Sequence, residues 1–207
     1  MTHRILGLTR TLIAFGTLAS ACAEAAVGAG AFDQRCYSDV PALQPTPADI
    51  NQQPLSTESS SAKANMDGKV IYEGDVQFIQ GLRTLDTNYA ELDKSGNNLT
   101  AKGNIFYQDG QLTLRSDKEL RSNLTNRQSS LDQAEYQLHG SPARGKAKRI
   151  NLNDQKKEMK MEGAQFTTCP PGHEMWWLKA SEVELNQDEV FGEAWNASIW
   201  LHGVPIF

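Results

Sequence analysis

The sequence has no excess of positive charge. It carries 20 lysines and arginines against 25 aspartates and glutamates in 207 residues, so the net charge is -5 and the isoelectric point is about 5.4. A domain that binds nucleic acid normally presents a basic stripe, and a protein held on anionic lipid carries polybasic segments. The charge balance argues against both classes of protein.

The motifs of common enzyme classes are also missing. There is no Gly-x-Ser-x-Gly elbow, no phosphate-binding loop and no His-Glu-x-x-His. The acidic residues are scattered through turns, and the histidines stand singly near turns or chain ends. Cys169 and His173 lack a second pair of ligands at zinc spacing. We therefore expect no enzyme, no metal site and no cofactor.

Long hydrophobic runs are absent after the first 25 residues. Arg4 and Arg10 precede an apolar run at 12–23, and Ala23-Glu24-Ala25 fits a small-x-small cleavage site. This pattern predicts a secretory signal peptide over residues 1–25. An uncleaved anchor is the alternative, although the run is short for a membrane-spanning helix. We therefore expect an exported chain.

Cysteine is scarce, with three in the chain. Cys22 falls in the predicted signal peptide, which leaves Cys36 and Cys169. In an oxidising compartment both are expected to form disulfides. They pair either with each other or with cysteines outside this chain.

Proline, serine and threonine concentrate in residues 26–65, which include Pro41, Pro45, Pro47 and Pro54. This composition predicts a flexible N-terminal arm. Ordered structure is expected from near Gly68, within a single domain over residues 66–207.

A short phrase recurs in that domain: a polar residue, glycine, a small or polar residue, an apolar residue and an aromatic. It occurs at Gly74, Gly103 and Gly163, with a looser copy at Gly192, so the spacings are 29, 60 and 29 residues. Self-similarity at this period indicates stacked supersecondary units. The apolar residues within each unit alternate with polar ones, which predicts strands rather than helices.

Turn signals separate the predicted strands. Asp109-Gly110 predicts a hairpin, and Gly140-Ser141-Pro142 predicts a break. No window of 12 residues has a helical period, although 116–125 is ambiguous. Many short antiparallel strands at this spacing predict an all-β sandwich or jelly-roll.

The alternating apolar positions are the candidate functional residues. The same side chains suit a packed core or a groove for acyl chains, because both need an apolar inner face. They are Val76, Phe78, Ile105, Tyr107, Leu112, Leu114, Tyr136, Leu138, Phe166, Trp176 and Leu178.

Two longer segments carry a family resemblance. One is Phe166-Thr167-Thr168-Cys169-Pro170-Pro171-Gly172 followed by Trp176, and the other is Glu193-Ala194-Trp195-Asn196-Ala197 leading to Val204-Pro205-Ile206-Phe207. Together they resemble the N-terminal periplasmic region of the lipopolysaccharide (LPS)-assembly protein LptD family. The phrases at Gly74 and Gly103 resemble the OstA-type repeat, which the periplasmic bridge protein LptA also carries.

The resemblance implies an OstA-type β-jelly-roll with an open, V-shaped groove that accepts the acyl chains of lipid A. It implies a periplasmic LPS-binding and transfer module at the outer membrane, which receives LPS from an LptA-type bridge by β-augmentation. A free-standing LptA-like bridge and a structural adaptor that docks by its edge strand are the alternatives.

In the resembled family the lipid passes on to a C-terminal outer-membrane barrel plugged by the lipoprotein LptE. Cys36 and Cys169 match family cysteines that form long-range disulfides to a pair at the far end of that barrel. The chain stops at Phe207, so we expect a truncation, and an LptE-type partner only if a barrel is present.

Overall fold

The computed structural model describes residues 40–45, 47, 50–186 and 192–206. The predicted signal peptide, Cys22 and Cys36 lie outside the described residues. Apart from one short 3-10 helix, η1 (Ile50–Gln52), the regular structure of the described part is β-strand. The all-β prediction is confirmed.

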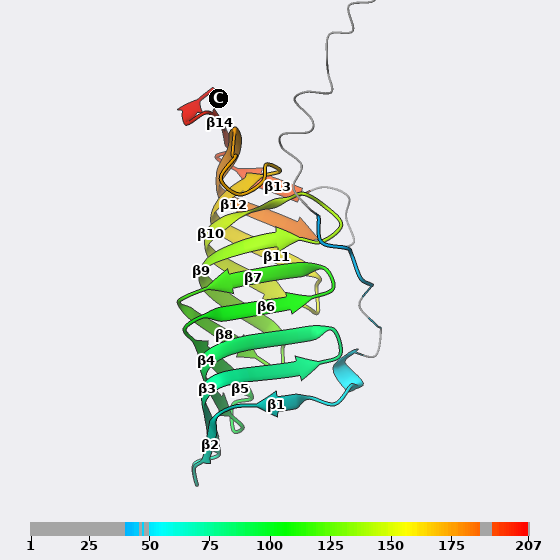
Figure 1. The fold of residues 1–207 in the computed structure, drawn as a ribbon, viewed down its shortest axis with the longest axis vertical. Helices are drawn as coiled ribbons and strands as arrows, with labels where there is room; N and C mark the ends of the chain where they lie inside the picture. The colour runs from blue at the N-terminus through cyan, green and yellow to red at the C-terminus, as the bar shows by residue number, and fades with distance from the viewer. Residues whose placement is uncertain (1–39, 46, 48–49, 187–191, 207) are drawn as a thin grey trace, which may run out of the picture.

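Within the described residues, fifteen antiparallel strands form a single folded sheet (Figure 1). The first eight are β1 (Ser56–Glu58), β2 (Ser61–Ala64), β3 (Lys69–Gln80), β4 (Arg83–Asp93), β5 (Asn98–Lys102), β6 (Ile105–Asp109), β7 (Leu112–Ser116) and β8 (Glu119–Asn123). The others are β9 (Gln128–Leu138), β10 (Arg144–Asn153), β11 (Glu158–Thr167), β12 (Trp176–Asn186), β13 (Gly192–Trp195), β14 (Ser198–Leu201) and β15 (Val204–Pro205).

The sheet folds into two layers because its long strands each contribute to both. The first half of β4 pairs with β6, whereas its second half pairs with β5. In β9 the first half pairs with β8 and the second half with β7. We call the two layers the β6–β7 layer and the β5–β8 layer. This arrangement confirms the predicted jelly-roll.

Glycine marks the points where the chain passes from one layer to the other. Gly74 and Gly103 have φ angles of 76° and 73°, and Gly163 has 57°. Asp75 and Asn104, which follow the first two, also have positive φ, so the strand bends sharply there. Three copies of the recurring phrase are therefore corners of the fold. The looser copy at Gly192 instead begins β13.

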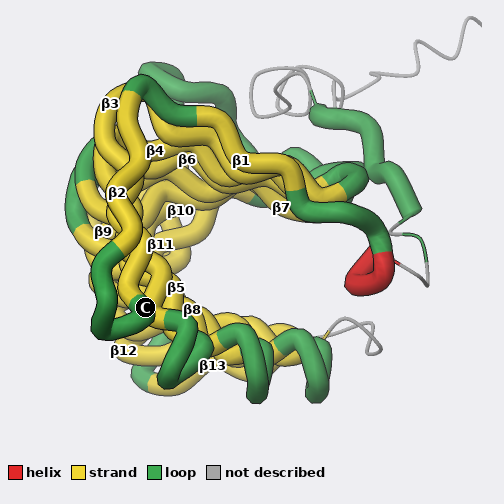
Figure 2. Tube along the Cα trace, turned by 90° about the horizontal axis from the view of Figure 1, so that it is seen from below, coloured by secondary structure: helices red, strands yellow, loops and turns green. Residues whose placement is uncertain are grey.

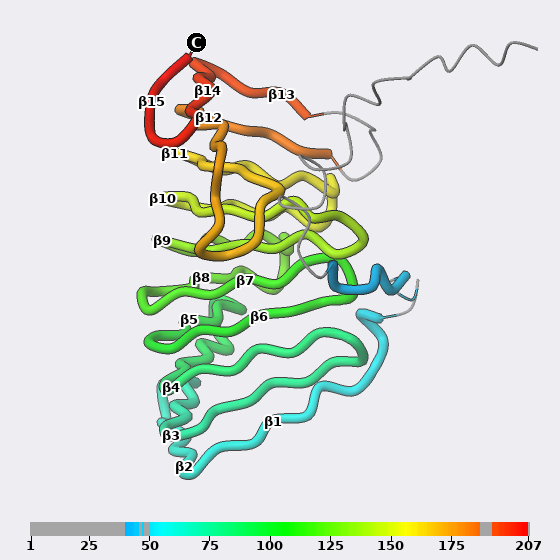
Figure 3. Tube along the Cα trace, turned by 45° about the horizontal axis from the view of Figure 1, so that its top comes forward, coloured from blue at the N-terminus to red at the C-terminus, as the bar shows by residue number. Residues whose placement is uncertain are grey.

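The two layers meet along one side of the molecule and diverge on the other, which gives the backbone a C-shaped cross-section (Figure 2). The strands stack one above another along the long axis, from β1 and β2 at one end to β14 and β15 at the other (Figure 3). Buried apolar side chains fill the space between the layers. The largest of these fully buried side chains are Ile105, Leu114, Leu131, Ile150, Met161 and Val76.

The ordered strands begin earlier than the sequence predicts. β1 and β2 precede Gly68 and pair with the two halves of β3. The sequence of β2 lacks a pattern of alternating apolar residues, because all of its side chains are exposed. Its strand conformation depends on main-chain hydrogen bonding instead. The ambiguous segment 116–125 contains β8, which pairs on both sides, with β5 and β9.

Part of the predicted arm lies against the turns of the sheet. The amide of Gln44 donates to the carbonyl of Gly110 at 2.8 Å, and the amide of Gly140 donates to the carbonyl of Pro41 at 2.7 Å. These bonds place residues 41–44 along the β6–β7 and β9–β10 turns.

Candidate functional site

A single row of apolar side chains crosses the β6–β7 layer from β3 to β12. Each member pairs directly with the next member on the neighbouring strand, except at one position where a glycine lies between two members. Residues that pair directly across strands point to the same face of a sheet. The row consists of Phe78, Leu85, Tyr107, Leu114, Tyr136, Phe166 and Leu178, with Gly145 between Tyr136 and Phe166. Six of these seven were predicted from sequence as candidate residues.

The Tyr136 side chain fills the gap that Gly145 leaves in this row. Its hydroxyl donates a hydrogen bond to the carbonyl of Gln165 at 3.1 Å. A Cβ atom on Gly145 would lie 2.8 Å from that hydroxyl and 1.8 Å from the Gln165 oxygen. The absence of a side chain at Gly145 therefore lets the tyrosine reach across β10 to β11.

A second row, in the β5–β8 layer, faces the first across the interior. Its members are also direct partners across neighbouring strands and most are buried. They are Ala90, Ala101, Leu120, Leu131, Ile150, Met161 and Val183. Sequence reasoning left this row out of the candidate site, although the same two-residue alternation was present in these strands.

The two rows belong to one continuous core. Tyr72 and Phe78 lie on either side of the bend in β3 and contact each other edge to face, with ring centroids 5.5 Å apart. Tyr72 is the direct partner of Ala90, which begins the second row, and Phe78 begins the first. This aromatic pair packs at the side where the two layers meet.

The predicted residues differ in burial. Six are buried in the core: Val76, Phe78, Ile105, Leu112, Leu114 and Tyr136. Tyr107 and Leu138 are half-buried against it. Phe166, Trp176 and Leu178 are half-buried outside the buried cluster, where the Phe166 and Trp176 rings lie 5.7 Å apart. The structure therefore brings all eleven to one inner face, with the more accessible ones toward β11 and β12.

Two tyrosines bring hydroxyl groups into this interior, and both remain neutral. Burial raises the pKa of Tyr107 well above its usual value, and its hydroxyl donates to Asp109 Oδ2 at 3.0 Å. Burial likewise raises the pKa of Tyr136. Because the phenols carry no charge, the interior presents an uncharged, mainly apolar surface, which suits hydrocarbon.

The segment around Cys169 is fastened to the sheet by Arg144. The Arg144 Nε donates to the carbonyl of Cys169 at 2.6 Å, and its Nη2 makes an ion pair with Glu174. Its guanidinium also lies 5.9 Å from the ring centroid of Trp177. Cys169 is buried and disulfide-bonded. Because the other two cysteines lie outside the described residues, its pairing with Cys36 stays a prediction.

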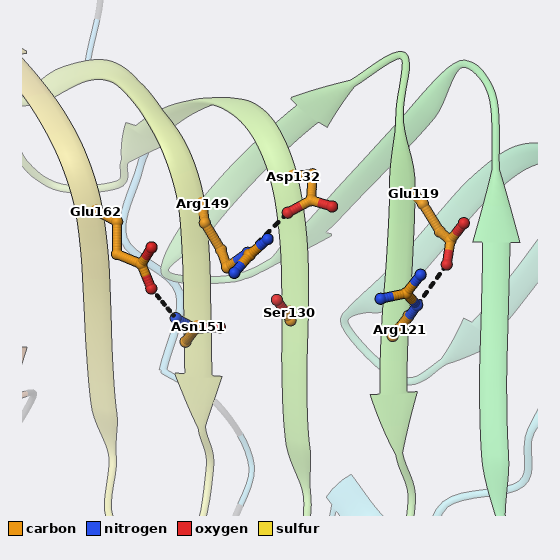
Figure 4. Close-up of a pocket in the computed structure, with 7 residues that line it drawn as sticks. All are labelled: Glu119, Arg121, Ser130, Asp132, Arg149, Asn151 and Glu162. Atoms are coloured by element: carbon orange, nitrogen blue, oxygen red, sulfur yellow. Dashed lines mark hydrogen bonds and ion pairs between the residues drawn. The ribbon is translucent and has the colours of Figure 1, made fainter.

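A polar depression lies on the outer face of the β5–β8 layer (Figure 4). Its side chains alternate along their strands with the buried second row, so they point away from the interior. Arg149 pairs with Asp132 at 2.8 Å, Arg121 with Glu119 at 2.5 Å, and Asn151 donates to Glu162 at 3.3 Å. Its charges largely neutralise one another, which is typical of a solvated sheet face.

Within the described ranges, no three His, Cys, Asp or Glu side chains gather as metal ligands would. The helical structure in that same part of the chain falls short of the length and apolarity needed to cross a bilayer.

Comparison with known proteins matches residues 56–191 to the family described as "LptA/(LptD N-terminal domain) LPS transport protein". The LPS-assembly protein LptD of Aeromonas hydrophila subsp. hydrophila is 43% identical over 218 residues, covering 100% of this chain and 27% of the relative. That of Aeromonas salmonicida is 46% identical over 180 residues, covering 86% of this chain and 22% of the relative. The chain thus spans about a quarter of the length of these curated relatives.

Among solved structures, the chain is similar to LptH of Pseudomonas aeruginosa, with a TM-score of 0.45 and 24% identity. LptH is described as the LptA-homologous periplasmic component of the lipopolysaccharide transport device. The match covers 52% of this chain and 80% of that one. The resemblance drawn from the Cys169 segment and the glycine phrases is confirmed by the family match and the curated relatives. That family's description is of a transport protein, in agreement with the expectation of a non-enzymatic role. The chain belongs to the LptA/LptD N-terminal domain family of LPS transport proteins.

Proposed function

We propose that the chain is a periplasmic LPS-binding and transfer module of the machinery that assembles LPS in the outer membrane. The observation that supports this most is the pair of facing apolar rows, which begin on β3 and β4 and both reach β12 without a charged side chain among them. Strands in a sheet lie about 4.8 Å apart, so a row across eight strands extends for roughly 34 Å. A long apolar interior of this kind suits acyl chains better than a compact substrate.

Acyl chains would enter between the layers and gain about 25 cal/mol for each Å² of apolar surface removed from water. The phosphorylated head group would stay at the side where the layers diverge, where charged side chains are available. A passive interior offers successive sites of similar affinity, so net transport requires an external source of energy.

The sheet ends supply docking positions for partners. β1 and β2 lie at one end of the strand order and β15 lies at the other. An edge strand presents unpaired main-chain groups that another strand can continue. We propose that an LptA-type bridge docks by such augmentation and delivers LPS to this module, with LptE contributing only beside a barrel.

Export of the chain follows from the predicted signal peptide over residues 1–25. We propose that it is cleaved and that the sheet domain, which begins with β1, resides in the periplasm at the outer membrane. An oxidising compartment agrees with the disulfide-bonded Cys169.

A structural adaptor is the second candidate, because six of the eleven predicted residues are buried in the core. In that case the interior is packed for stability, and the edge strands alone engage partners. A free-standing LptA-like bridge would use the same interior as the transfer module.

Light-driven crosslinking in LPS-producing cells distinguishes these candidates. The photoreactive p-benzoylphenylalanine replaces Tyr107, which points inward, or Phe106, its outward neighbour on β6, whose ring lies 4.5 Å from the Arg115 guanidinium. LPS adducts at residue 107 but not at 106 are expected for the transfer module. A folded chain without adducts at either position would favour the adaptor.

A further inference from the structure

Arg83 and Asp154 lie at the tips of opposite layers. Arg83 begins β4 and pairs in the sheet with Gln80 and Asp109, at the free end of the β6–β7 layer. Asp154 directly follows β10, whose last residue, Asn153, pairs with neighbours at the free end of the β5–β8 layer. The free ends of the two layers lie on the side where the layers diverge (Figure 2).

An ion pair joins these two tips. The Arg83 Nη2 lies 2.7 Å from Asp154 Oδ2, although the residues are 71 positions apart in the chain. The Arg83 side chain is 22% exposed and that of Asp154 is 42% exposed. The contact therefore spans the open side of the fold, unlike an ion pair between neighbouring strands of one layer.

Arg83 also forms a hydrogen bond with the short helix η1. Arg83 Nη1 donates to Asn51 Oδ1 at 2.8 Å. η1 itself is anchored by Ile50, which is 3% exposed, and by the hydrogen bond from Gln80 Nε2 to the carbonyl of Gln53 at 3.1 Å. Figure 2 shows η1 at the side where the two layers diverge.

This ion pair borders the apolar interior. Tyr107, a member of the first row, is the direct partner of Leu85, two residues after Arg83. The charges of both Arg83 and Asp154 act on the Tyr107 hydroxyl. The Arg83 Nε is buried without a hydrogen-bond partner. The Arg83 side chain is therefore partly buried at the edge of the interior.

We propose that Arg83, Asp154 and Asn51 form a latch that closes the open side of the jelly-roll, and that it must open for an acyl chain to pass sideways between the layers. This inference rests on the function proposed above. A partly exposed ion pair suits such a role, because water competes for both partners and the contact breaks readily. The apolar core then keeps the fold intact while the tips separate.

Charge reversal and its repair test the latch in the whole chain. Arg83→Glu places two carboxylates at the tips and should open them, whereas Arg83→Glu/Asp154→Arg restores opposite charges. With p-benzoylphenylalanine in place of Phe166, a half-buried member of the first row, the initial rate of LPS adduct formation should rise several-fold in the single variant. It should return toward the parent rate in the double variant.

The Lys146–Glu135 pair provides the matched control. These residues are direct partners on β10 and β9, 2.6 Å apart and exposed, so their contact stays within one layer. Lys146→Glu and Lys146→Glu/Glu135→Lys should leave the adduct rate unchanged. Hydrogen–deuterium exchange of the purified chain gives a lipid-independent readout, since exchange at the 81–84 and 153–158 tips should quicken in Arg83→Glu and recover in the double variant.

The outcomes separate the latch from the proposed function. If the parent chain forms adducts at position 166 and Arg83→Glu forms them at the same rate, the latch is overturned while the lipid-binding function stands. If adducts are absent even in Arg83→Glu, both are overturned. If adducts appear only in Arg83→Glu, the latch is supported in its strongest form.

Discussion

The Tyr136 hydroxyl occupies the space above Gly145 and bonds to the main-chain oxygen of Gln165, one strand further on. This contact makes a residue of β9 a direct neighbour of β11 and keeps the inner face of the β6–β7 layer continuous. The geometry depends on a glycine near the start of β10, although glycine within a strand otherwise weakens the sheet.

Gly145→Ala should destabilise the domain. Its Cβ would lie 1.8 Å from the Gln165 carbonyl oxygen, so β10 and β11 would have to move apart. We expect a loss of about 1–3 kcal/mol, in the range of other overpacked sites, measured by urea unfolding followed by circular dichroism. Gly172→Asn is the control, because that position has open space and asparagine tolerates its positive φ. Equal stability of Gly145→Ala and the parent would show that the two strands can separate freely.

Acid should weaken the contact between Arg144 and Glu174. Hydrogen bonding to Arg144 holds the pKa of Glu174 below its usual value of 4.5. The folded chain thus favours the carboxylate, and this stabilisation is present above pH 4.5 and lost as the pH falls through the lowered folded value.

Glu174→Gln should therefore cost about 1.5 kcal/mol at pH 7, the lower end for a hydrogen bond to a charged group because Glu174 is partly exposed, and progressively less below pH 4.5. Unfolding midpoints measured across this range provide the check. Glu135→Gln removes an exposed partner and should change stability little. If the loss of stability in Glu174→Gln, relative to the parent chain, stayed constant down to about pH 3, the assigned role of the ion pair would be contradicted.

The positive φ angle at Asn104 should make the stability of the domain depend on which residue occupies this position. Its φ angle is 47°, a conformation that β-branched residues strongly avoid. Asn104→Val should lose about 1–2 kcal/mol of stability, whereas Asn104→Gly should be nearly neutral. Gln108→Val, on the neighbouring strand β6, is the control for the effect of valine in this region. A stable Asn104→Val would mean that the bend does not depend on this conformation.

Phe78→Asp should unfold the domain, whereas Phe106→Asp should be tolerated. Phe78 is 7% exposed in the core, so a carboxylate there would be buried without a partner. Phe106 points outward toward Arg115, which could accommodate the charge. Near-ultraviolet circular dichroism and thermal unfolding report the result. A native-like Phe78→Asp chain would indicate an interior open enough to hydrate the carboxylate.

The sequence predicted the inner face of one layer well and missed that of the other. Leu112, Leu114, Tyr136 and Leu138 alternate with polar residues and proved to be direct partners across β7 and β9. Ile150 and Leu152 alternate with polar residues in the same way, yet sequence reasoning did not assign them to the site. Alternation identifies which side chains share a face, but it does not reveal that the other half of the same strand faces them from a second layer.

The sequence by itself determined the strand periodicity, the Asp109-Gly110 hairpin, the glycine phrases and the family to which the chain belongs. These depend on local chemistry: the two-residue repeat of a strand, the turn preference of glycine and a distinctive segment around Cys169. Only the tertiary structure decided that β4 divides its pairing between β5 and β6, that Tyr136 covers Gly145, and that Arg83 meets Asp154. Those relationships join residues far apart in the chain, because they depend on how the whole sheet folds over its core rather than on any local pattern.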